Sequence, residues 1–136
     1  MIPRRPPLAC LSAALPAVAL FALGCGDPAS PAVPTVNVSI IQGAVAQGPK
    51  GFAPNPLVTT VAGGKRVVWT NGDYTDNGYG SVSGGTAHHL ISNQGLFDSG
   101  NVNPQGSFTF DFPGAGTYQY HCLVHPGMTG TITINP

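Results

Sequence analysis

Charged side chains are scarce in this chain, and glutamate is missing altogether. Only 7% of the 136 residues are charged, and the formal net charge is zero. Binding to nucleic acid needs a basic face, so this composition argues against that class of protein. Long runs with a helical apolar period are also missing beyond residue 35, and this absence argues against a helical bundle.

The N-terminal segment resembles a bacterial lipoprotein signal. Arg4 and Arg5 precede an uncharged apolar run over residues 8–23, and Cys25 follows between two glycines. We expect a signal peptide over 1–24, lipidation of Cys25, and an exported protein in the periplasm or at the cell surface, held to the membrane only by that lipid. Simple cleavage is the alternative. A membrane-spanning helix needs about 20 apolar residues, and Pro16 interrupts this shorter run.

The cysteines have no partners for a disulfide once the signal is removed. Cys10 leaves with the signal, Cys25 takes lipid, and Cys122 remains alone. A free thiol in an oxidising compartment is exposed to oxidation unless a metal occupies it. The proline-rich stretch over 25–35 predicts an extended tether, and residues 36–136 suffice for one domain with one core.

Short apolar stretches between glycine, proline and asparagine predict an all-β domain, either a β-sandwich or a β-barrel. Apolar and polar residues alternate at 36–40, 108–112, 118–122 and 132–134. Such alternation is typical of strands with one buried face. We expect Trp69 to lie in the core. Residues 43–51 and 72–85 are rich in small polar residues, and both are predicted to be loops.

A metal site is indicated near the end of the chain, where Cys122, His125 and Met128 stand at equal spacing. Copper accepts a thiolate, an imidazole and a thioether together, whereas a structural zinc site uses four Cys or His ligands. One further histidine would complete the set. His88 and His89 are both candidates, and because neighbouring residues of a strand face opposite sides, only one of them can reach the metal. Periodicity alone does not decide between them.

Four segments in order resemble the plastocyanin and amicyanin group of cupredoxins over about residues 36–136. They are Phe52-Ala53-Pro54-Asn55-Pro56, then Val67-Val68-Trp69, then Thr86-Ala87-His88-His89-Leu90-Ile91-Ser92, and finally Gly116-Thr117-Tyr118-Gln119-Tyr120-His121-Cys122. The resemblance implies a Greek-key β-sandwich. It also implies one type 1 (blue) copper ion held by His88, Cys122 and His125, with Met128 as a weak axial ligand. It favours His88 over His89. Plastocyanins have Asn at the position of His89, and here the two residues before Met128 resemble amicyanin.

The expected function is single-electron transport between redox proteins, without catalysis. A catalytic copper would need more histidines than the four present, and no residue is marked to orient a Cys-His nucleophile pair. A copper-carrying or copper-buffering protein is the alternative, although labile Cu(I) favours exposed sites with several methionines. The family resemblance implies docking of the electron donor and acceptor on the apolar surface near His125. We expect a monomer.

Overall fold

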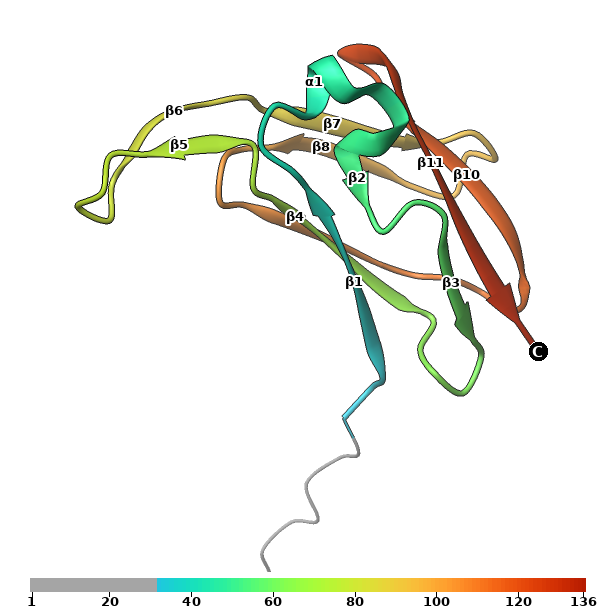
Figure 1. Cartoon of the computed structure of the whole chain (residues 1–136). Helices are drawn as coiled ribbons and strands as arrows, with labels where there is room; N and C mark the ends of the chain where they lie inside the picture. The colour runs from blue at the N-terminus through green and yellow to red at the C-terminus, as the bar shows by residue number, and fades with distance from the viewer. Residues whose placement is uncertain (1–31) are drawn as a thin grey trace, which may run out of the picture. The chain divides into compact units, whose positions relative to one another are not determined.

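The computed structural model describes residues 32–136, which form two main β-sheets and a small separate one (Figure 1). The first sheet contains, in spatial order, β2 (Phe52–Ala53), β1 (Thr35–Ile40), β4 (Arg66–Asn71) and β9 (Ser107–Asp111). The second contains β3 (Leu57–Thr60), β11 (His125–Asn135), β10 (Gly116–Cys122), β7 (His88–Ser92) and β8 (Asp98–Val102). The predicted all-β sandwich is confirmed.

The predicted signal over 1–24, the predicted lipidation of Cys25 and most of the predicted tether lie outside the described residues. Strand β1 begins at Thr35, the last residue assigned to that tether. Within residues 32–136, no helix is long and apolar enough to cross a membrane.

An aromatic cluster joins the two sheets, with Trp69 of β4 at its centre. The Trp69 side chain is fully buried, and its ring lies 5.4 Å from the ring of Tyr120 on β10 in an edge-on arrangement. Phe97, Phe108 and Phe112 also pack within 5.4–6.3 Å of Trp69, measured between ring centres. Aromatic pairs at such distances add stabilisation to that of the buried area. The prediction that Trp69 is a core residue is confirmed.

One glycine is required for this packing. Gly130 on β11 lies opposite Tyr120 in the β10–β11 pair. A Cβ atom at Gly130 would overlap the Tyr120 ring, so a side chain here would displace the aromatic cluster. Tyr120 is two residues from Cys122 on the same face of β10, and the cluster therefore supports the strand that carries the cysteine.

Two predicted loops contain regular structure, and both predictions were wrong. Residues 43–51 form a short helix α1 (Ala44–Gln47) followed by the 3-10 turn η1 (Gly48–Gly51). Residues 72–85 contain a hairpin of β5 (Tyr74–Asp76) and β6 (Val82–Gly85), which projects from the sandwich as an arm (Figure 1). Neither segment has strong intrinsic propensity. Contacts with η1 and β11 support α1, whereas the arm is held by its own β5–β6 pairing and by turn hydrogen bonds to the side chains of Asp76 and Asn77.

Candidate metal centre

The ends of two neighbouring strands bring Cys122 and His125 together. Strand β10 ends at Cys122, strand β11 begins at His125, and only Leu123 and Val124 connect them. An irregularity between His121 and Cys122 shifts the pairing at this point, so that Cys122 lies opposite His125. The Cys122 Sγ is 3.5 Å from Nδ1 of His125.

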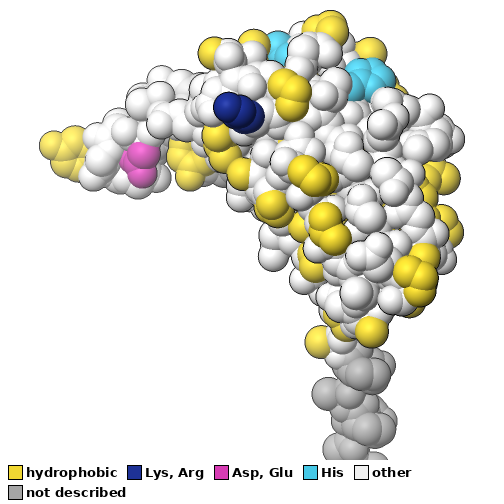
Figure 2. All heavy atoms as spheres, turned by 45° about the vertical axis from the view of Figure 1, so that its right-hand side comes forward, with side chains coloured by type: hydrophobic (Ala, Val, Ile, Leu, Met, Phe, Trp, Pro, Cys, Tyr) yellow, Lys and Arg dark blue, Asp and Glu magenta, His cyan; other side chains and the backbone are white. Residues whose placement is uncertain are grey.

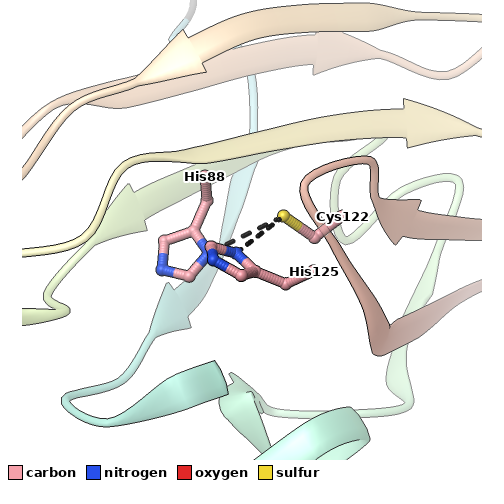
Figure 3. A group of neighbouring side chains, drawn as sticks. All are labelled: His88, Cys122 and His125. Carbon is pink, nitrogen blue, oxygen red and sulfur yellow. Dashed lines mark hydrogen bonds between the residues drawn. The ribbon is translucent and has the colours of Figure 1, made fainter.

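His88 reaches the same place from β7, which pairs with β10 on its other side. Leu90 lies opposite Cys122, and His88 is two residues away on the same, buried face of β7. Its Nδ1 is 3.7 Å from the Cys122 sulfur, and the two imidazole rings lie 5.1 Å apart between centres. Figure 3 shows one nitrogen of each ring directed toward the sulfur. Donor atoms of the three residues all lie within 4.8 Å of one another.

The fourth predicted ligand, Met128, lies on β11 three residues after His125. Its side chain is fully buried and belongs to the hydrophobic core, in contrast to the exposed Pro126 and Gly127 before it. The structure thus brings His88, Cys122 and His125 into one group and places Met128 in the adjoining core. The axial role of Met128 remains a prediction.

His89 faces away from this group. Its Nε2 is 2.5 Å from the Oδ1 of Asp98, an exposed residue on the neighbouring strand β8. The main chain of His89 nevertheless supports the site, because its carbonyl accepts a 2.7 Å hydrogen bond from the Leu123 N–H. In this way β7 is tied to the loop that follows Cys122, although the Asn typical of plastocyanins is absent.

The environment of Cys122 favours the thiolate. Burial alone would raise the pKa of the Cys122 thiol. Hydrogen bonds from His88, from the main chain of His89, from His125 and from the main chain of Val124 outweigh burial and lower this pKa to about 6. Burial opposes the charged form of His88 in the same way, but hydrogen bonds to Cys122 and Asp73 raise the His88 pKa. Without metal, these shifts favour an imidazolium–thiolate pair.

Asp73 is the residue of this centre to which sequence reasoning assigned no role. It lies between β4 and β5, is 6% exposed, and its Oδ2 is 3.0 Å from Nε2 of His88. Fifteen residues separate the two in sequence, because the β5–β6 arm is inserted between them. The sequence shows Asp73 only as one of two acidic residues, with Asp76, that follow the apolar strand at 66–71, and nothing local links it to His88.

The donor set fits a single copper ion of type 1. It offers one sulfur that is readily deprotonated and two imidazole nitrogens, and the thioether of Met128 follows three residues after His125 on β11. Copper accepts such a mixture of soft and borderline ligands, whereas a structural zinc site requires four ligands of the Cys or His type. The described residues contain one cysteine, Cys122, and no second thiolate for a zinc site.

Comparison with solved structures shows the cupredoxin fold. A purple cupredoxin from Nitrosopumilus maritimus is 26% identical, with a TM-score of 0.57, and the match covers 74% of this chain and 99% of that one. A reduced Cu(I) form of an amicyanin variant at pH 4 is 22% identical, with a TM-score of 0.53, over 79% of this chain and 88% of that one. A second reduced amicyanin variant is 21% identical, with a TM-score of 0.54, over the same shares. No family model and no curated protein matches the chain.

Proposed function

We propose that this chain, which has the cupredoxin fold, carries single electrons between redox proteins through one copper ion. The observation that supports this most is the assembled group of His88, Cys122 and His125, in which both imidazoles already approach a buried sulfur. Copper bound there would supply a one-electron Cu(I)/Cu(II) couple. Met128 is the proposed weak axial ligand.

The surrounding chain keeps the three donor groups in place, and this property suits electron transfer. His88 is fixed by Asp73, and the loop after Cys122 is tied to β7 by the hydrogen bond from Leu123 to His89. Side chains that are already positioned need little movement when the charge of the site changes, so the energy of reorganisation stays small. A carrier that delivers copper would instead need an exposed and labile site, whereas Cys122 and His88 are both 0% exposed.

Redox cycling under competition for copper separates the two functions. The protein would be loaded with Cu(II), then reduced and reoxidised repeatedly in the presence of a Cu(I) chelator. We expect the visible absorption band of the Cys122 thiolate bound to Cu(II) to disappear on each reduction and return on each reoxidation while the metal stays bound. Loss of copper to the chelator at the first reduction would contradict electron transfer and support copper carriage.

The proposed docking surface for the redox partners is the end of the molecule at which His125 lies. Leu123 and Val124 are 49% and 52% exposed, and Pro126 and Gly127 are exposed beside them. Figure 2 shows histidine side chains reaching the surface at the upper end of that view, where hydrophobic side chains are present and charged ones are few. An apolar surface beside the partly exposed His125 ring lets a partner approach the ligand closely.

Electron self-exchange between two copies of the protein tests this surface without a known partner. Leu123→Glu would bring two negative charges together at the docking surface, so we expect self-exchange to slow, measured by NMR line broadening in mixtures of both oxidation states. Val58→Glu is the control, since Val58 is 59% exposed on β3 and pairs with Thr133 of β11, far along that strand from His125. Equal rates in both variants would contradict docking near His125.

Export as a lipoprotein is a separate proposal, based on the sequence around Cys25. Firm membrane attachment by lipid needs two or more acyl chains, as a lipidated N-terminal cysteine would carry. Cys25→Ser should therefore shift the protein from the membrane fraction to the soluble fraction, or block its processing. The same distribution for wild type and variant would contradict lipidation.

A further inference from the structure

Both carboxylate oxygens of Asp73 have defined partners in the protein. Its Oδ2 contacts Nε2 of His88 at 3.0 Å, and its Oδ1 accepts a 2.7 Å hydrogen bond from the Gly43 N–H. The main chain of Asp73 is held equally well, because its N–H donates to Oδ1 of Asn71 at 2.9 Å and its carbonyl accepts from the Thr86 N–H at 2.9 Å. Asp73 is therefore a fixed group.

We propose that Asp73 is a positioning residue for the copper site, which selects the ring nitrogen that His88 presents to the metal. This inference rests on the proposed function. A carboxylate oxygen only accepts hydrogen bonds, so Nε2 of His88 must donate. In the neutral ring, the lone pair then lies on Nδ1, the nitrogen that faces Cys122. A metal ligand whose second nitrogen donates to a carboxylate is fixed in orientation and is also more basic.

The negative charge of Asp73 should stabilise the Cu(II) and Cu(I) states of the site to different extents. Its side chain is only 8% exposed, so water screens its charge poorly. A nearby negative charge stabilises the more positive Cu(II) state over Cu(I), and a more basic imidazole acts in the same direction. Asp73 therefore lowers the reduction potential of the copper centre.

A second His–Asp contact in the chain provides a control for the contact of His88 with Asp73. His89 and Asp98 form the same kind of contact on the other face of β7, but the Asp98 side chain is 63% exposed and His89 faces away from Cys122. Asp98→Asn removes the same single charge from an equivalent contact. Any general effect of losing one negative charge near the site would appear in both variants.

Asp73→Asn tests the proposal in the copper-loaded protein. An amide has one acceptor oxygen, so the new side chain would be unable to accept from both Gly43 and His88. We expect Cu(II) affinity to fall about 10- to 100-fold. If only the affinity for Cu(II) falls and the affinity for Cu(I) is unchanged, the reduction potential of the copper site rises by about 60–120 mV, because each tenfold change in affinity corresponds to about 59 mV. Asp98→Asn should leave both quantities close to wild type. Wild-type affinity and potential in Asp73→Asn would overturn the proposal.

The metal-free protein provides an independent measurement. Nitrogen-15 NMR of the His88 ring distinguishes the two tautomers at alkaline pH, where imidazoles are neutral. It is recorded in the metal-free Cys122→Ala variant, because a Cys122 thiolate would compete with Asp73 for the single ring proton. We expect the proton on Nε2 in Cys122→Ala and a shift toward Nδ1 when Asp73→Asn is added. A proton on Nδ1 in Cys122→Ala would overturn the proposal, and this result decides it even where Asp73→Asn does not fold. Since no copper is needed, a failure of the proposed function would remain distinguishable from a failure of this inference.

Discussion

Replacement of Asn71 by Ala should destabilise the protein far more than the same replacement of Asn55. Each side chain makes three hydrogen bonds. Asn71 is 0% exposed; its Nδ2 donates to the carbonyls of Thr86 and Val102 at 2.8 and 2.9 Å, and its Oδ1 accepts from the Asp73 N–H at 2.9 Å. The bonds to Asp73 and Thr86 tie the end of β4 to both ends of the segment that leads to His88, and the bond to Val102 ties it to β8.

Burial determines the size of the expected loss. A buried polar group left without its partner costs about 1–3 kcal/mol, and Asn71→Ala affects three such groups. At the lower end of that range for each group, we expect a loss of about 3–4 kcal/mol. Asn55 bonds to the carbonyls of Pro49 and Thr129 and to the Thr131 N–H, but it is partly exposed. Water can replace its bonds, and we expect Asn55→Ala to cost about 1 kcal/mol.

Urea unfolding of the metal-free protein measures both losses. Trp69 is the single tryptophan and is fully buried, so its fluorescence reports unfolding of the core. A domain of this size is usually stable by about 5–15 kcal/mol, so the Asn71 variant should remain folded without urea. The reasoning is refuted if the two free energies of unfolding differ by less than about 0.5 kcal/mol, the usual range of surface substitutions.

Three further predictions concern the site. In the metal-free protein, the ultraviolet absorption of the Cys122 thiolate should have its midpoint near pH 6 and disappear as the pH falls through that value, because hydrogen bonds lower the thiol pKa from 9. A midpoint near pH 9 would contradict this environment of Cys122. Met128→Leu should keep the copper band and raise the potential, and Met128→Gln should lower it, whereas loss of copper from the Leu variant would remove the axial role. His88→Ala should abolish the band or open the site to added imidazole, and His89→Ala should preserve it; the reverse result would assign the ligand to His89.

The sandwich could be predicted because its strands follow a simple alternation. In β9, Phe108 and Phe110 point inward between exposed polar residues, and in β10, Tyr120 and Cys122 do the same. The motif from Cys122 to Met128 was also visible, since its residues are close in sequence. These features depend on local order along the chain, which a sequence displays directly.

Other features depend on contacts between distant segments. Helix α1 has four residues and no side-chain cap, and it begins after Gly43 in a left-handed conformation with φ of 69°. Packing rather than propensity therefore decides that α1 forms, because a helix this short is not stable alone. The contact of Asp73 with His88 spans the inserted β5–β6 arm, and no local pattern indicates it. The choice between His88 and His89 also depends on distant contacts, since the strand would bury an apolar residue, Leu90 or Ile91, whichever histidine faced inward.

Copper titration of the wild type and of Cys122→Ser tests the central claim most directly. The claim is that the sulfur of Cys122, with His88 and His125, holds one copper ion. The account predicts one copper per wild-type chain with an intense thiolate-to-Cu(II) band in the visible spectrum, and no such band in Cys122→Ser. His121→Ala is the control, because the ring of His121 bonds to Asn93 outside the group and its loss should leave the band intact. An equally intense band in Cys122→Ser would contradict the account.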